Sequence, residues 1–132
     1  PDPREWAALW FEKARENLTN AQHDLASGFY ANVCPKVAHQ TAEIGFKAYL
    51  FAQGEEPEHI HVLPDLLEHC IQYDRDFRRL GVDADMLDAY YVDTRYLRPA
   101  NAPYDEFDAN EAVKAASRIF AFVSKRIKPL LK

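Results

Sequence analysis

The sequence predicts an all-α protein, folded as an up-and-down antiparallel bundle of four to five helices. Apolar residues recur at intervals of three and four over several long stretches, which is the spacing of an amphipathic helix. Only four glycines interrupt the 132 residues. No stretch alternates apolar and polar residues for long enough to predict a strand.

A chain of this length is expected to form one domain, covering residues 1–132. No apolar run approaches the roughly 20 residues that span a bilayer, and the opening PDPREW lacks the pattern of a signal peptide. Cys34 and Cys70 fall within helical patterns, where reduced, buried thiols are expected. These features predict a cytoplasmic protein without membrane association.

The first two predicted helices cover residues 3–26 and 31–53. Asp2 is expected to cap the first helix, with Pro3 at its first position and Ser27-Gly28 at its end. The predicted buried stripe of this helix is Trp6, Leu9, Trp10, Ala14, Leu18, Ala21 and Leu25. The second helix stops before Gly54. It is apolar around most of its circumference, which predicts a position at the centre of the bundle.

Three more helices are predicted, over residues 61–79, over residues 84–96 and from residue 108 or 110 onwards. Gly81 is expected to separate the first two of these, and residues 97–107 to form a loop. Asp108 or Asn110 would cap the last helix, because Asp108-x-x-Glu111 has the spacing of a capping box.

Charge is distributed unevenly along the chain. Residues 1–111 hold all 21 acidic residues and ten basic ones, a net charge of −11, whereas residues 112–132 hold six basic residues and no acidic one, a net charge of +6. The basic segment either complements the dipole and the acids of the rest of the protein or faces phosphate.

Two polar spots interrupt the apolar helices. On the second helix, His39, Glu43 and Lys47 follow one another at intervals of four; they form either a surface ion pair or the lining of a groove. The stretch VDTRYLRP, residues 92–99, combines Arg95, Arg98 and Tyr96. Its arginines either cap a helix end or bind phosphate, with the tyrosine stacking on a base.

The sequence gives little support for a metal site, a phosphate-binding loop or a catalytic nucleophile. The one Glu-x-x-His match, Glu56-x-x-His59, spans Pro57 in a predicted loop, so it does not resemble a metal site on a helix. No glycine-rich phosphate loop or nucleophile elbow is present. We therefore expect no metal, no cofactor and no catalytic thiol.

The chain resembles the HEPN domain family (higher eukaryotes and prokaryotes nucleotide-binding). The matching pieces occur in the family's order: WFEKARENLTNAQ, the Phe29-Tyr30 turn, HQTAEIGFKAYLFAQG, HVLPDLLEHC and the Arg-Tyr pair of TRYLRP. The resemblance implies a helical bundle, often a homodimer, found with a minimal nucleotidyltransferase. It also implies binding of nucleotide or RNA, and many members are toxins that cut RNA.

Catalytic members of the family carry an arginine followed by four to six residues and a histidine. None of the arginines in this sequence has a histidine at that distance, so we expect a non-catalytic module. The predicted phosphate site consists of Arg95, Tyr96, Lys47, Glu43, His39 and His61. Arg95 and Lys47 would hold phosphate, Tyr96 would stack or hydrogen-bond, and Glu43 would orient Arg95 or Lys47.

Two alternatives stay open. One is an RNA-cleaving toxin in which Arg95 pairs in space with His39 or His61. The other is a purely structural dimerisation or interaction module, in which Arg95 merely caps a helix.

Overall fold

The computed structural model describes residues 2–30, 37–92 and 104–131. Within these ranges the chain forms five α-helices, three short 3₁₀ helices and no strand, which confirms the all-α prediction. The α-helices are α1 (Ala7–Ala26), α3 (His39–Ala52), α4 (Leu63–Tyr73), α5 (Gly81–Val92) and α6 (Glu106–Ile127). The 3₁₀ helices are η1 (Pro3–Trp6), η3 (Arg75–Leu80) and η5 (Lys128–Leu130).

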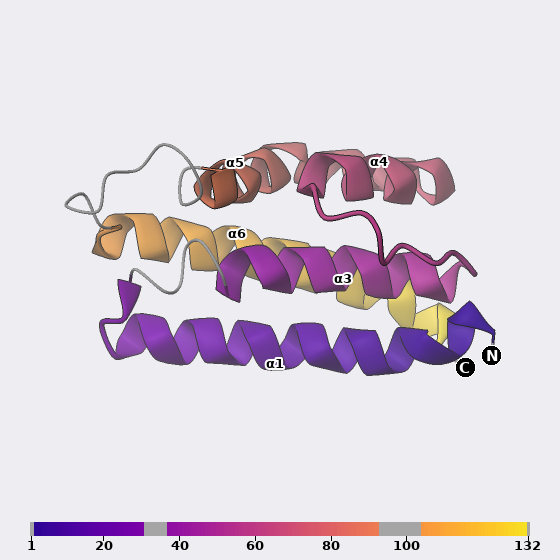
Figure 1. Cartoon of the computed structure of the whole chain (residues 1–132), viewed down its shortest axis with the longest axis horizontal. Helices are drawn as coiled ribbons and strands as arrows, with labels where there is room; N and C mark the ends of the chain where they lie inside the picture. The colour runs from indigo at the N-terminus through magenta and orange to yellow at the C-terminus, as the bar shows by residue number, and fades with distance from the viewer. Residues whose placement is uncertain (1, 31–36, 93–103, 132) are drawn as a thin grey trace.

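Successive long helices alternate in direction along the bundle. In Figure 1, α1 and α5 run towards one end of the molecule, and α3 and α6 run towards the other. The shorter α4 runs in the same direction as α3, because the segment 53–62 returns along the bundle before α4 begins. Segment 53–62 and α4 therefore lie over the outer side of α3.

The predicted central helix is confirmed. α3 contacts α1, α4, α5 and α6, and eleven of its fourteen residues are buried. Phe77 of η3 packs beside it, with ring centroids 4.5 Å from Tyr49 and 4.9 Å from Phe122. Burial of such aromatic side chains dominates the energetics of a small core.

The buried face of α1 agrees with the predicted stripe at Ala14, Leu18 and Ala21 but differs from it in the first two turns. Its buried residues are Ala7, Phe11, Ala14, Leu18 and Ala21, which alternate spacings of four and three in the manner of a coiled-coil seam. Trp6 and Leu9 lie outside the seam and are 44% and 62% exposed, so their predicted burial was wrong. Small alanines at every seventh position allow the neighbouring helices to approach α1 closely.

Local signals set most helix ends. Asp2 caps the chain start as predicted, although the first turn is the 3₁₀ helix η1. Gly28 and Gly54 follow α1 and α3 with positive φ values of 83° and 92°, which favour glycine after a helix end. α3 begins at His39, preceded by a π turn at residues 37–38; residues 31–36, including Cys34, lie outside the described residues.

Two predicted boundaries were wrong. The break after α4 occurs at Asp74, which is extended (φ −153°, ψ 108°) and accepts a hydrogen bond from the Asp76 amide, whereas Gly81 is helical and begins α5. The last helix is capped by Asp105, whose side chain accepts from the Asp108 amide. Asp105 and Asp108 form the capping box, so Asp108 is its third helical residue and not the cap.

Candidate functional site: a polar cluster between α3, α5 and segment 53–62

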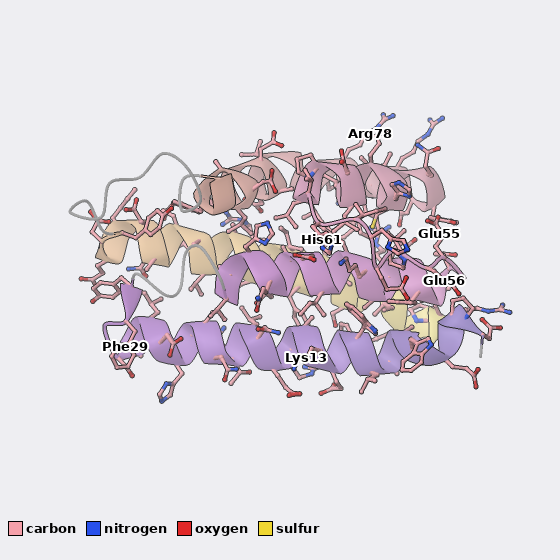
Figure 2. The ribbon with its side chains drawn as sticks, viewed as in Figure 1. Lys13, Phe29, Glu55, Glu56, His61 and Arg78 are labelled. Carbon is pink, nitrogen blue, oxygen red and sulfur yellow. The ribbon has the colours of Figure 1, made fainter. Side chains whose placement is uncertain are left out.

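Three polar residues of α3 share one face of the helix. His39, Glu43 and Lys47 are spaced by four, which stacks their side chains along α3. Segment 53–62 crosses this face and brings His61 over the middle of the helix (Figure 2). Asp88 approaches from α5. The four residues predicted on α3 and in the loop therefore form one cluster with a fifth residue, Asp88.

Glu43 is the centre of the cluster. Its Oε2 atom lies 2.9 Å from Lys47 Nζ and 3.1 Å from His61 Nδ1. Its Oε1 atom lies 3.7 Å from His39 Nδ1. One carboxylate thus binds three potential cations from two segments of the chain, and it ties segment 53–62 to α3.

Lys47 is buried, with 3% of its surface exposed. Besides its bond to Glu43, its ammonium donates to the Glu58 carbonyl oxygen at 3.4 Å and lies 3.4 Å from His61 Nδ1. It also lies 5.9 Å from the centre of the Trp10 ring, within the range of a cation–π contact. A buried ammonium needs such partners to offset its lost hydration. Lys47 is therefore already engaged inside the protein.

His39 lies deeper than His61. Its Nε2 atom is 3.5 Å from Asp88 Oδ1. Burial lowers the pKa of the His39 imidazole below its ordinary value, and the Glu43 and Asp88 carboxylates oppose that shift. The same Asp88 oxygen accepts a hydrogen bond from the Leu63 amide at 3.1 Å, so Asp88 also caps the first turn of α4.

His61 is the exposed member of the cluster. Its side chain is 66% exposed, and its Nδ1 atom faces Glu43 and Lys47. A ring nitrogen cannot donate to Glu43 and accept from Lys47 at once, so the tautomer decides which bond forms. The rest of the imidazole faces solvent, where it could donate to or accept from a ligand.

With neutral histidines the cluster carries one positive and two negative charges, from Lys47, Glu43 and Asp88. The described residues contain no group of three or more histidine, cysteine or acidic side chains arranged to hold a metal ion. The cluster is suited to fixing the position of His61 and segment 53–62. An anionic ligand would need positive charge from outside it.

Arg95 and Tyr96, the other two predicted site residues, lie outside the described residues, as does Arg98. α5 ends at Val92, one helical turn beyond Asp88. The cluster therefore lies near the point from which the chain continues towards Arg95. Asp88 was missed by sequence reasoning, although its place one turn before VDTRYLRP was a usable signal.

Much of the basic segment 112–132 pairs with acids of the same chain. Arg118 makes two hydrogen bonds with Asp83, at 2.9 and 2.8 Å, and Arg126 pairs with Asp74 and Asp76. Charge complementation within the protein therefore accounts for these two arginines. In the part of the chain that the structure describes, no helix is both long enough and apolar enough to cross a lipid bilayer.

Comparison with known proteins places these features in a family. A profile of the HEPN domain matches residues 7–127. The fold is similar to the crystal structure of TT1696 from Thermus thermophilus, with a TM-score of 0.76 and 36% identity over 91% of this chain and 97% of that one. It is also similar to ST0689, an archaeal HEPN homologue, with a TM-score of 0.72 and 26% identity over 92% and 98%.

A search of curated proteins found no match. The profile match extends over almost the whole chain, and both structural relatives are covered nearly completely. The protein belongs to the HEPN domain family.

Proposed function

We propose that this protein is a non-catalytic helical module that binds nucleotide or RNA phosphate. The observation that supports this most directly is the convergence of His39, Glu43, Lys47 and His61 beside the end of α5. Arg95 and Tyr96 follow α5 by three and four residues. An arginine supplied from there would give the acidic cluster the positive charge that a phosphate requires.

The cluster geometry divides the proposed roles. Arg95 holds the phosphate and Tyr96 stacks or hydrogen-bonds, whereas His61 offers its exposed imidazole edge. Glu43 and Lys47 orient His61, because their charges are already bound to each other and to the loop. This role for Lys47 is more indirect than the phosphate contact that the sequence suggests.

We further propose the context that the family resemblance implies. The module acts in the cytoplasm as a homodimer and as the partner of a minimal nucleotidyltransferase, in a pair of the toxin–antitoxin type. Size-exclusion chromatography with light scattering, on the purified protein alone and with a co-expressed nucleotidyltransferase, tests the homodimer and the complex with that enzyme. A monomer that elutes separately from that enzyme would contradict both.

A titration with ATP and with labelled single-stranded RNA, at low and moderate salt, tests the binding function. Wild type is compared with Arg95→Ala and His61→Ala, and with Lys13→Ala, which removes an exposed charge from α1. We expect salt-sensitive binding of ATP that Arg95→Ala abolishes and Lys13→Ala leaves intact, and RNA binding that Arg95→Ala weakens. Equal affinity of wild type and Arg95→Ala would refute the proposed site.

An RNA-cleaving toxin is the second candidate, and the exposed imidazole of His61 favours it. Glu43 lies 3.1 Å from His61 Nδ1, an arrangement that can orient a histidine for proton transfer. This function predicts shortened RNA in the same titration, and growth arrest on expression that Arg95→Ala or His61→Ala relieves. Neither binding nor cleavage by wild type would leave a purely structural interaction module.

A further inference from the structure

A second polar surface lies where α4 meets η3. A groove of about 440 Å³ there is lined by Ile71, Gln72, Tyr73, Asp74, Arg75 and Arg78. Figure 2 shows Arg78 at the outer edge of the molecule, on the opposite side from Lys13 of α1. None of these residues belongs to the cluster around Glu43.

The 3₁₀ geometry of η3 directs the two arginines to the same edge. With three residues per turn, side chains at i and i+3 eclipse one another. Phe77 and Leu80 are buried in the core, whereas Arg75 and Arg78 are exposed. Their Cα atoms are separated by about 6 Å along the helix axis, which suits contacts with neighbouring phosphates of one strand.

These arginines are available for a ligand. Arg4, Arg15, Arg118 and Arg126 each pair with a carboxylate. Among the described residues, no carboxylate lies within ion-pair distance of Arg75, Arg78 or Arg79, and all three are exposed.

The acidic residues next to them, Asp74 and Asp76, share one cation, Arg126. Arg126 Nη1 lies 2.5 Å from Asp74 Oδ2, and Arg126 Nη2 lies 3.2 Å from Asp76 Oδ2. Arg126 also lies over the Phe122 ring at 4.6 Å. With Glu55, which accepts a hydrogen bond from the Tyr73 hydroxyl, this junction holds four arginines and three carboxylates, a local charge of +1 on a chain whose net charge is −5.

An aromatic ring lies within the same groove. Tyr73 is 43% exposed, and its hydroxyl donates to Glu55, which restrains the ring. Gln72 adds an exposed amide. Planar guanidinium groups match phosphate oxygens, an aromatic face stacks on any base, and together they are typical of single-strand binding. An acidic peptide would use the arginines but not the ring.

We propose that the groove between Tyr73, Arg75 and Arg78 binds single-stranded nucleic acid, with backbone phosphates on the arginines and a base on Tyr73. This surface is separate from the proposed site at Arg95 and does not depend on it. It can hold a strand whether or not that site binds nucleotide.

Fluorescence anisotropy with labelled oligouridine RNA at several salt concentrations tests the proposal. The double substitution Arg75→Ala/Arg78→Ala should weaken binding roughly tenfold or more at 0.1 M salt, and should reduce the salt slope by about 1.4, at about 0.7 for each lost phosphate contact. Tyr73→Leu should lower affinity without changing the slope. The charge-matched control Lys13→Ala/Lys114→Ala, which removes two exposed lysines, should bind as wild type does.

The outcomes separate this surface from the proposed site. Weak RNA binding by Arg75→Ala/Arg78→Ala, with normal ATP binding, supports the groove regardless of the RNA affinity of Arg95→Ala. If Arg75→Ala/Arg78→Ala binds RNA with wild-type affinity and slope, the proposal is overturned, even where Arg95→Ala abolishes binding. Wild type that does not bind RNA, or RNA that polyglutamate displaces as effectively as unlabelled RNA, also overturns it. Circular dichroism and urea midpoints establish that each variant is folded.

Discussion

Lys47 shows how a single charged residue is kept inside this bundle. Its ammonium is nearly inaccessible, and loss of hydration disfavours the folded state. The Glu43 carboxylate, the Glu58 carbonyl and the Trp10 ring surround it. The free energy of unfolding therefore depends on the whole set of partners. Removing Lys47 or Glu43 alone costs more stability than removing both residues of the ion pair.

Lys47→Met is expected to lower the free energy of unfolding by about 2–4 kcal/mol, because Glu43 loses its closest cation in a partly buried setting. The double substitution Glu43→Gln/Lys47→Met should recover most of that loss. Urea unfolding of the four proteins of this cycle measures the coupling. A Lys47→Met protein within about 0.5 kcal/mol of wild type would show that Lys47 is solvated in solution.

His39 makes the stability depend on pH. Its pKa is lowered in the folded state by burial, against the opposing carboxylates of Glu43 and Asp88. The unfolded chain therefore takes up a proton on this residue at a higher pH than the folded protein does. Its contribution to stability is complete above the ordinary histidine pKa of about 6.5 and is lost as the pH falls through the lowered value.

We expect the free energy of unfolding to decrease as the pH falls below about 6.5, and His39→Gln to flatten that decrease. Urea unfolding at several pH values provides the test, with His23→Gln, a substitution on α1, as the matched histidine control. Equal pH dependence in wild type and His39→Gln would contradict the assignment.

Among the helices, α4 depends on α5 for its start. Val62 occupies the N-cap position of α4 without a side-chain hydrogen bond, and Asp88 of α5 accepts from the Leu63 amide instead. The side chain that caps the helix is thus 25 residues distant in sequence. It joins the start of α4 to the polar cluster on α3.

Asp88→Ala should lower the free energy of unfolding by about 1–3 kcal/mol, since it removes the cap of α4 and one partner of His39. Asp85→Ala, on the exposed face of the same helix, is the matched control and should change it by less than about 0.5 kcal/mol. Chemical denaturation measures the free energy of unfolding of both variants. Equal effects of the two substitutions would contradict this role of Asp88.

The start of α6 offers a second comparison between elements. Asp105→Ala should lower the free energy of unfolding by about 1 kcal/mol through loss of the capping box. Asn110→Ala removes a residue that the sequence suggests as the cap, and it should have a smaller effect because Asn110 lies within the helix. Thermal unfolding measures both variants, and a larger loss of stability in Asn110→Ala than in Asp105→Ala would place the cap at Asn110.

Packing around α3 controls access to the interior of the entire bundle. Because α3 contacts each of the other described α-helices, a group beneath it becomes accessible only when the bundle opens. Cys70 of α4 is fully buried there, with its Sγ atom 3.8 Å from the Phe46 carbonyl oxygen. Burial raises the pKa of the Cys70 thiol well above its ordinary value.

In a Cys34→Ser protein, where Cys70 is the one remaining cysteine, we expect the thiol to be unreactive towards a disulfide reagent under native conditions. Reaction should accelerate with urea in parallel with unfolding, and the denatured protein serves as the control for full reactivity. Rapid labelling of the native protein would show that α3 and α4 separate without global unfolding.

Features that rest on local interactions could be predicted from the sequence alone. Apolar periodicity identified the helices and the central position of α3, and Asp2, Gly28 and Gly54 marked helix ends because caps and positive φ values depend on a few neighbouring residues. Spacing by four also placed His39, Glu43 and Lys47 together, since the helix alone sets that geometry.

The remaining features required the assembled bundle. Periodicity placed Trp6 in the buried stripe of α1, whereas packing against the neighbouring helices buries Ala7 instead. The contact between His61 and Glu43 closes a separation of 18 residues along the chain, and Asp88 reaches His39 from a different helix. The helix break at Asp74 is an exception, because its cap on the Asp76 amide is local and was nevertheless missed in favour of the glycine at position 81. Contacts between distant segments depend on how the helices assemble, and the free energy that selects among assemblies belongs to the whole core and not to any local segment.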